Sequence, residues 1–499
     1  MPPPRALVGL VVGTALALGT AACSEPPPRT SLRTGIVGDR TAELTVWLGP
    51  QDSLHPQDTS PHLAAAIATP LVATDPASRL PTWGPDVPGA LLSAISSPDL
   101  QRWELTITEG RRWADGTPIT AADLVRGWER SIDRGVPLLS TVEGLRAVDD
   151  RTVAVRLTAP FGQLPLLLGD QAFLPVHPEA AEDQPIGDGP YAVVETSDDR
   201  LVLALVADHP LAADGAATPI LVDTTREPGP DVDVAVGDDG QPTPPAGIGA
   251  ANRPALVRAP GRQLAHLGLP LDEPAFADVD VRTALSLSLD VPAIAADVAG
   301  DAVIPADRLI GPGLPRDDDV TCAACRHDPE RARQLWGDGI DGPLTLWFAS
   351  DGGHDELVDA VAGAWREVLG VEDIQLASEP GADLLGRLAD GDVTGPFRLT
   401  WQADVPAAVR VLEPLFASQG AANDVRLRDE AIDDLLARAG GERDLDDSLA
   451  GYAAVEQAVL DEVAVIPLWF STIPLAASAD VTGVGLDGAG RLDWTALGG

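Results

Sequence analysis

The most informative segment of this chain is "RRWADGTPITAADLV", residues 111–125. It places two acidic side chains near a threonine and a tryptophan, a composition that suits a reaction site as well as a structural motif. Asp115 and Gly116 form a dipeptide typical of tight turns. Thr120 stands three residues before Asp123, the spacing of a helix capping box, and apolar residues follow at helical spacing. Every polar group therefore has a backbone role, and we interpret the segment as scaffold.

Strands and helices alternate along the rest of the sequence. The strand before the tight turn is predicted to end near Trp113. Runs rich in β-branched and aromatic residues predict strands at 44–48, 103–107, 152–157, 191–196, 201–206, 344–348, 397–401 and 464–470. Apolar residues at helical spacing predict helices at 354–369, ended by Gly370, at 428–439, ended by Gly440 and Gly441, and at 445–463. This alternation indicates α/β lobes.

Size and charge restrict the function. At 499 residues the chain is too long for one compact core, so two or three lobes are expected. The 76 acidic and 34 basic residues give a net charge of -42, which would repel nucleic acids and anionic membrane surfaces. All the basic residues are arginine. A genome rich in G and C would favour arginine codons, and adaptation to high salt would favour the acid excess; the sequence leaves both explanations open.

The beginning of the chain has the pattern of an export signal. Residues 1–22 contain a basic residue, the apolar run 6–18 and then small residues. Residues 20–23 resemble a bacterial lipoprotein cleavage box, in which Cys23 becomes the first residue and carries diacylglycerol. Two acyl chains would hold the protein firmly at the membrane. In the alternative, ordinary cleavage after Ala22 would leave a free thiol.

The segment after the signal is predicted to be a flexible tether. Residues 23–41 include three successive prolines and show no apolar period, so the folded part is expected to begin near Ala42. Together with the lipid anchor, the tether predicts an exported protein on the outer face of the bacterial cell membrane.

Two further cysteines, Cys322 and Cys325, lie in "TCAACRHDPERARQLW". A redox pair of this spacing sits at a helix N-terminus, which lowers the pKa of the thiol. Here the helix is predicted to start later, with Asp328 as its cap and Pro329 in its first turn. The cysteines then lie in the preceding loop. We expect a structural disulfide, in preference to a redox pair or to a metal site, which would need a second cysteine pair.

The opening motif, extended to "RRWADGTPITAADLVRGWERSID", closely resembles the motif of the family 5 solute-binding proteins of ABC transporters, the oligopeptide and dipeptide binding group. Further segments are similar to that family in order and spacing: "SLHP" (53–56), "PIGDGPYAVVE" (185–195), "VDVRTALSLSLDVPAIAADVAG" (279–300), "DPERARQLW" (328–336), "FRLTWQADVP" (397–406) and "AVIPLWF" (464–470). The resemblance covers about residues 42–480.

The resemblance implies an α/β fold of the two-lobe type seen in periplasmic binding proteins (type II, cluster C), with an extra subdomain in the first lobe. Carried onto this chain, lobe I would be 42–58, 186–263 and 478–499, the inserted subdomain 59–185, and lobe II 264–477. In this family a ligand binds between open lobes and favours the closed form. The implied partners are a permease and an ATPase of an ABC importer, and the implied oligomeric state is a monomer.

The resemblance also implies which residues meet the ligand. The strand similar to Thr400, Trp401 and Gln402 pairs with the main chain of an extended peptide in that family. The acid similar to Asp404 pairs with the ligand's α-amino group, and Trp401 would wall the cavity. In the alternative interpretation, Asp404 only caps a helix after Pro406. No cofactor, catalytic residue or metal ligand is expected.

Three positions depart from the family pattern. Val405 stands in place of a tyrosine, Asp188 in place of a small hydroxyl residue, and Gly268 where asparagine is frequent. Family members also carry sugars, opines, haem or metal chelates, so a non-peptide ligand stays an alternative to peptides. A surface receptor with the same fold but no transport role is a further alternative.

An enzyme is the remaining rival hypothesis. The sequence contains no Gly-x-Ser-x-Gly elbow, phosphate-binding loop or HExxH motif. No histidine lies between His62 and His177 to serve residues 111–125 as a base. The seven histidines are scattered: His55, His62, His177, His209, His266, His327 and His354. The sequence therefore favours a binding protein over a catalyst.

Overall fold

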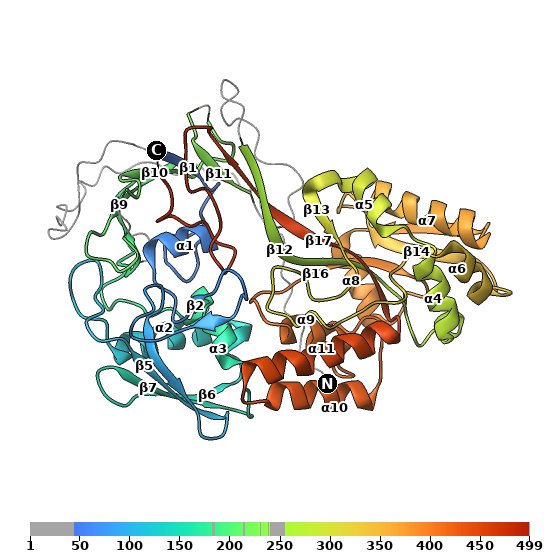
Figure 1. The fold of residues 1–499 in the computed structure, drawn as a ribbon, viewed down its shortest axis with the longest axis horizontal. Coiled ribbons are helices and arrows are strands. Elements are labelled where there is room, and N and C mark those ends of the chain that lie inside the picture. Colours follow the sequence, from blue (N-terminus) through green and yellow to red (C-terminus); the bar gives the residue numbers. More distant parts are fainter. Residues whose placement is uncertain are drawn as a thin grey trace, which may run out of the picture.

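The computed structural model describes residues 44–181, 185–212, 215–229, 231–237, 239 and 255–498. The predicted export signal 1–22, the lipid site Cys23 and the whole predicted tether 23–41 lie outside this part of the chain. Two lobes lie side by side, and the long strands β12 (Ala255–Gly268) and β17 (Val465–Ala477) run from one lobe to the other (Figure 1).

One sheet extends through both lobes because β12 and β17 pair along much of their length. Its strand order is β15-β14-β16-β12-β17-β11-β1-β10-β9-β8, and β13 pairs with β17 off this path. The first lobe contributes β1 (Leu44–Trp47), β8 (Tyr191–Thr196), β9 (Arg200–Leu205), β10 (Ile220–Asp223) and β11 (Val234–Val236). The second lobe contributes β13 (Val303–Pro305), β14 (Leu344–Ala349), β15 (Ile374–Glu379) and β16 (Phe397–Gln402).

Helices cover the sheet of the second lobe. They are α4 (Val279–Leu287), α5 (Val291–Ala299), α6 (Pro329–Trp336), α7 (Asp355–Leu369), α8 (Gly381–Asp390), α9 (Val409–Phe416), α10 (Glu430–Gly441) and α11 (Leu445–Asp461). The predicted apolar stripe of α7 is buried, including Trp365, and Gly370 ends the helix with φ +72°. The predicted end of α10 is wrong by two residues, because the helix continues through Gly440 and Gly441.

A separate antiparallel sheet of order β4-β5-β7-β6 forms the inserted subdomain, below α1 (Pro61–Ile67) in Figure 1. Its strands are β4 (Leu92–Ser96), β5 (Arg102–Ile107), β6 (Val142–Ala147) and β7 (Thr152–Leu157). Helix α2 (Ala121–Asp133) packs on it and buries Trp128 completely. The short elements β2 (Ala73–Thr74), β3 (Pro81–Thr82) and α3 (Leu164–Leu167) complete this region.

The segment 111–125 is scaffold, as predicted. Gly116 has φ +87° in the tight turn, and the Asp123 carboxylate accepts hydrogen bonds from the backbone N–H and the hydroxyl of Thr120, both at 2.9 Å. The predicted strand end near Trp113 is wrong, because β5 ends at Ile107. The backbone of Trp113 instead donates to Thr117 O at 2.9 Å, which closes a compact loop.

Helices α10 and α11 reach from the second lobe to the inserted subdomain (Figure 1). Arg443, in the loop between them, donates to Ser97 O at 2.7 Å, and the backbone of Gly162 donates to Gly440 O at 2.9 Å. One hydrophobic core includes side chains from both regions, for example Trp128 and Leu412. The subdomain is therefore supported by the second lobe as well as the first. The predicted lobe limits stay a proposal.

In the described part of the chain no single helix is long and apolar enough to cross a bilayer, although α4 and the segment 291–302 pass that test together with a 50° bend between them.

Candidate functional site

Two segments bring charged groups together where the strands that join the lobes cross. Asp404 follows β16, and Arg262 lies in β12, which pairs with β16. The Arg262 side chain donates to the backbone oxygen of Asp404 at 2.9 Å. This crossing, which also contains the predicted contact residues of β16, is the candidate ligand site.

Strand β16 presents two predicted contact residues to solvent. Thr400 and Gln402 are exposed, although β16 lies between β14 and β12 in the sheet. Strand β14 meets β16 only at the pair Trp347 and Phe397, whereas β12 pairs with β16 through Gln402. Among the described residues, no strand covers the other edge of β16 beyond Phe397. That edge offers main-chain groups to an extended partner.

Trp401 is half-buried on the same strand, with its ring held in place. Its indole N–H donates to Arg410 O at 2.7 Å. A fixed aromatic ring beside an open strand edge is suited to line a ligand cavity.

Asp404 is already engaged by a neighbour. Its two carboxylate oxygens accept from Arg410 Nε at 2.9 Å and Nη2 at 2.7 Å, and its backbone oxygen accepts from Arg262 at 2.9 Å. The alternative role as a helix cap is wrong, because α9 begins at Val409 with Ala408 in the capping position. The proposed contact with a ligand ammonium would have to be shared with Arg410.

The sequence interpretation missed Arg398, a buried cation on β16. It is 6% exposed, and it forms no ion pair with any residue that the structure describes. Its guanidinium donates to the Thr400 hydroxyl, its Nε has no partner in the described chain, and burial lowers its pKa to about 10. Strand alternation places residues 398, 400 and 402 on one face. That period could have identified Arg398.

Two histidines near Arg398 do not add to its charge. Burial lowers the pKa of both His266 and His354 to about 4, and the charge of Arg398 lowers each of them further. Both rings are therefore neutral at pH 7, and the cation next to the open strand edge stays without a counter-ion from the described residues.

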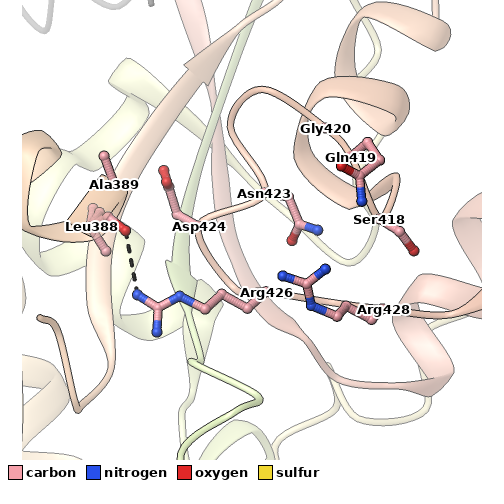
Figure 2. Close-up of a pocket in the computed structure, with 9 residues that line it drawn as sticks. All are labelled: Leu388, Ala389, Ser418, Gln419, Gly420, Asn423, Asp424, Arg426 and Arg428. Carbon is pink, nitrogen blue, oxygen red and sulfur yellow. Dashed lines mark hydrogen bonds between the residues drawn. The ribbon is translucent and has the colours of Figure 1, made fainter. Parts of the chain in front are cut away.

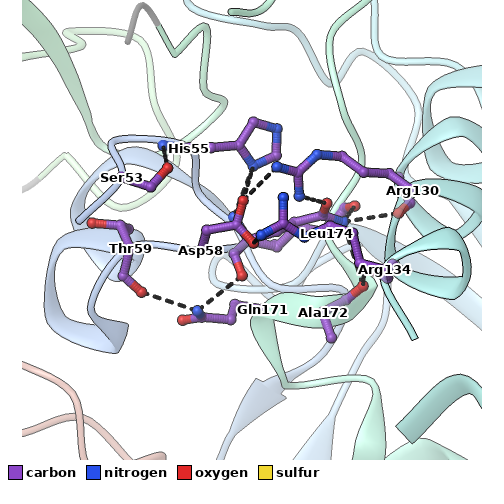
Figure 3. A network of polar contacts seen from close by, with 12 residues as sticks. Ser53, His55, Asp58, Thr59, Arg130, Arg134, Gln171, Ala172 and Leu174 are labelled. Carbon is purple, nitrogen blue, oxygen red and sulfur yellow. Dashed lines mark hydrogen bonds and ion pairs between the residues drawn. The ribbon is translucent and has the colours of Figure 1, made fainter. Parts of the chain in front are cut away.

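A polar network fixes the subdomain beside the site (Figure 3). Asp58 forms ion pairs with Arg130 of α2 and, at 3.2 Å, with Arg134, which follows the last residue of that helix. The Gln171 amide donates to Thr59 O at 3.0 Å and to Gln57 O at 3.2 Å. The short helix η2 (Gln171–Phe173), and Asp170 directly before it, are thereby held in position.

A pocket of about 240 Å³ lies elsewhere in the second lobe, between the end of α8 and the loop after α9 (Figure 2). Arg426 reaches across it to Leu388 O at 3.4 Å and also pairs with Asp272 at 2.8 Å. None of the predicted ligand residues lines this pocket; its lining is Leu388, Ala389, Ser418, Gln419, Gly420, Asn423, Asp424, Arg426 and Arg428.

Two other predicted features also have clear positions. Cys322 and Cys325 form a disulfide with an S–S distance of 2.01 Å. A Cβ at Gly268 would lie 2.3 Å from the ring of Phe397, which explains why this chain has glycine there.

Asp115 in the opening segment lies beside His177, which is far from it in the sequence. The spacing of histidines along the chain did not indicate this contact. His177 Nε2 lies 3.3 Å from the Asp115 carboxylate. The Thr117 hydroxyl donates to the same carboxylate at 2.7 Å, and the buried His177 ring packs edge-on against Trp113. These contacts close the loop rather than expose a nucleophile. The described residues contain no group of three or more histidine, cysteine or acidic side chains that could hold a metal ion.

Comparison with known proteins places this geometry in context. Residues 85–209 and 230–423 match the family described as bacterial extracellular solute-binding proteins, family 5 Middle. The chain is 25% identical over 453 residues to the periplasmic murein peptide-binding protein MppA of Escherichia coli (strain K12), covering 77% of this chain and 80% of that protein.

Two solved structures show the same fold. The unliganded open form of MppA has a TM-score of 0.75 at 20% identity and covers 91% of this chain and 96% of that one. Haemophilus influenzae OppA in complex with RPPGFSPFR has a TM-score of 0.60 at 18% identity and covers 92% and 99%. These matches confirm the predicted two-lobe α/β fold.

Proposed function

Because the chain belongs to family 5 of the bacterial extracellular solute-binding proteins, we propose that it captures peptides between its two lobes and delivers them to the permease of an ABC importer. The observation that carries this proposal is the open edge of β16 at the crossing, where Thr400 and Gln402 are exposed. An extended peptide can pair with such an edge through its main chain, whatever its side chains.

The charges at the crossing suit a ligand with ionised ends. Arg398 is a buried cation without a counter-ion among the described residues, so a ligand carboxylate would relieve the cost of its burial. Asp404, together with Arg410, lies beyond the end of the same strand. A short peptide carries a carboxylate at one end and an ammonium at the other, and it can therefore satisfy groups at both places.

Capture between two lobes requires that the lobes close on the ligand. Ligand binding would then shift the lobes toward the closed form by contacts made only there.

The cellular setting follows from the N-terminal pattern. We propose that residues 1–22 are removed, that Cys23 is lipidated, and that residues 23–41 tether the lobes to the outer face of the cell membrane. The protein would act as a monomeric, non-catalytic partner of a permease and an ATPase.

Native mass spectrometry of the full purified chain tests the ligand class. We expect a mixture of copurifying ligands with peptide masses. Their side chains should differ, because recognition depends on the peptide main chain. Refilling the protein with synthetic peptides methylated at single backbone nitrogens then tests the pairing with β16. Methylation at alternate positions should weaken binding about tenfold per lost bond, because strand pairing uses every second N–H toward one neighbour.

Two results would contradict this proposal. A copurifying sugar or metal chelate would show that the ligand of this chain is another class of solute and not a peptide. Equal loss of affinity from methylation at every position would remove main-chain pairing as the mode of recognition.

A further inference from the structure

Strand β12 contains a bulge at the point where it crosses between the lobes. The regular pairs with β17 stop at Pro260 and resume at Leu264, so residues 261–263 lie opposite Ser471 alone. Backbone N–H groups in a bulge lose their partners in the ladder, and buried ones must find other acceptors. The conformation of this bulge therefore depends on side chains that supply those acceptors.

The half-buried Asp239, which follows β11 in the first lobe, supplies them. Its Oδ2 accepts from the backbone N–H of Arg262 at 2.8 Å, and its Oδ1 accepts from the Ser471 hydroxyl. The Ser471 oxygen in turn accepts from the backbone N–H of Gln263 at 3.1 Å. We call the Asp239 carboxylate and the Ser471 hydroxyl the clamp, because together they hold two backbone N–H groups of the bulge.

The clamp fits closely against the strand. A Cβ at position 261 would lie 1.9 Å from Asp239 Oδ1 and 2.3 Å from Ser471 Oγ, so only glycine can stand there. On another side, a Cβ at Gly313 would lie 2.3 Å from the backbone oxygen of Gly261. The bulge is thus enclosed by packed atoms, and the clamp holds it in one defined geometry.

The two residues that the clamp holds contact the candidate ligand site. Arg262 Nη1 donates to Asp404 O at 2.9 Å, and Gln263 Nε2 donates to Gln402 Oε1 at 3.2 Å. Gln263 Nε2 also donates to Asp239 O at 3.0 Å. A continuous series of hydrogen bonds therefore runs from Asp239 in the first lobe to the end of β16 in the second.

We propose that Asp239 is a positioning residue for ligand binding. Its carboxylate fixes the bulge of β12, so that Arg262 and Gln263 hold the end of β16 in the arrangement that receives a ligand. Groups that are held in place before binding lose little freedom when the ligand arrives, which favours affinity. This inference rests on the proposed function, and it gives the first lobe a part in shaping a site that belongs to a strand of the second.

The test measures affinity and stability on the full purified chain. Equilibrium dialysis against a pool of random short peptides, called the peptide pool, gives the affinity, and urea unfolding gives the stability. Asp239→Ala removes both carboxylate oxygens, whereas Asp239→Asn keeps one oxygen for the Arg262 N–H. Arg262→Met removes the guanidinium that contacts Asp404. Asp231→Ala, at an exposed position before β11, is the matched control.

We expect Asp239→Ala to bind the peptide pool about tenfold more weakly than the wild type, the effect of one lost charge-assisted hydrogen bond. Asp239→Asn should stay within about threefold of the wild type, and Asp231→Ala should bind normally.

A double-mutant cycle separates positioning from a general loss of stability. Because Asp239 acts partly through Arg262, Asp239→Ala should weaken binding by at most about threefold when Arg262→Met is already present. A merely structural residue would lower the stability in both backgrounds and weaken binding by the same factor in each.

Unchanged binding by Asp239→Ala, or equal tenfold losses in the two backgrounds, would overturn the inference and leave the proposed function intact. A wild-type chain that binds no peptide would overturn both. A thermal melt identifies misfolding. If Asp239→Ala does not fold, Asp239→Ser, whose single hydroxyl cannot bridge Arg262 and Ser471, is put through the same two comparisons and decides the outcome.

Discussion

Asp188 is a carboxylic acid buried where the first lobe meets the inserted subdomain. Its Oδ1 accepts from Thr69 N–H at 3.0 Å, while its Oδ2 has no partner in the described chain. Burial raises its pKa to about 6, although the charge of Arg111 acts in the opposite direction. His209, which contacts Thr69, stays neutral nearby because burial lowers its pKa to about 4.

The raised pKa of Asp188 predicts a stability that depends on pH. The folded chain binds this proton more tightly than the unfolded chain, so the cost of the buried charge is complete above about pH 6 and disappears as the pH falls toward the unfolded value. Asp188→Asn should therefore be more stable than the wild type at pH 7.5 by up to about 3 kcal/mol, with the gap closing near pH 4. Urea unfolding at both pH values measures it.

The exposed control for that experiment is Asp208→Asn, in the loop after β9. A gap between wild type and Asp188→Asn that does not change with pH would show that the proton of Asp188 has no part in stability.

Arg398 predicts a conflict between stability and binding. Its burial without an acidic partner lowers its pKa to about 10, so the folded chain bears the cost of a desolvated charge. Arg398→Met should raise the free energy of unfolding by about 1 to 3 kcal/mol and weaken peptide binding at least about tenfold. Urea unfolding and peptide dialysis on the same preparation test both parts. A variant that is less stable and binds normally would show that Arg398 is a purely structural residue.

Helix α2 depends on a carboxylate outside the helix. Asp58 contacts Arg130 and Arg134 of the α2 region and lies 3.9 Å from His55. The Gln57 amide beside it donates to three backbone oxygens, including Gly127 O in α2 and Leu174 O. The segment 55–58, which overlaps "SLHP" and continues to Asp58, is therefore a connector that fixes the subdomain to the first lobe.

Removing the charge of Asp58 should loosen this connection. Asp58→Ala removes the ion pairs with the 17%-exposed Arg130 and with Arg134, and we expect a loss of about 1 to 3 kcal/mol in unfolding free energy. Hydrogen exchange should rise first in α2 and η2. Asp133→Ala, on the exposed face of the same helix, is the matched control and should cost less than about 0.5 kcal/mol. Equal losses in the two variants would mean that Asp58 has no special role.

Local sequence signals predicted most elements well. Strands β1, β5, β7, β8, β9, β14 and β16 lie within one residue or so of their predicted limits, because their apolar alternation and turn residues act over short distances. The predicted strand end near Trp113 is wrong because contacts with residues distant in the sequence decide the conformation there. This buried side chain looks like part of a strand, yet contacts with Asp123 and His177 hold it in a loop.

The ladder between the two strands that join the lobes is interrupted at the crossing. Strand β12 changes register against β17 between Pro260 and Leu264, and Pro260 has no N–H to give to the ladder. This break lies beside Arg262 and the candidate site. A small rotation at the break would bring the lobes together over a ligand.

Closure predicts a measurable change in shape. Addition of the peptide pool should lower the radius of gyration of the full chain in small-angle X-ray scattering, whereas a disaccharide of similar mass should not change it. An unaltered radius while mass spectrometry shows bound peptide would mean that the chain binds without closing.

The net charge of -42 predicts a strong effect of salt on stability. Raising NaCl from about 0.05 M to about 1 M shortens the screening length to about 3 Å, which weakens the repulsion among the acids of the folded chain. The melting temperature should rise by several degrees at pH 7.5 and by much less near pH 4, where many carboxylates are protonated. A flat response at pH 7.5 would favour codon usage over adaptation to salt as the origin of the acidic, lysine-free composition.

The sequence alone determined the α/β elements, the capping box at Thr120 and the likeness to a two-lobe binding protein, because each depends on residues within a few positions of one another. The tertiary structure decided which charges are free. Arg410 forms an ion pair with Asp404, and Arg398 is buried without an acid among the described residues. A charge is neutralised by whatever the fold places within a few ångströms of it, and spacing along the chain does not contain that information.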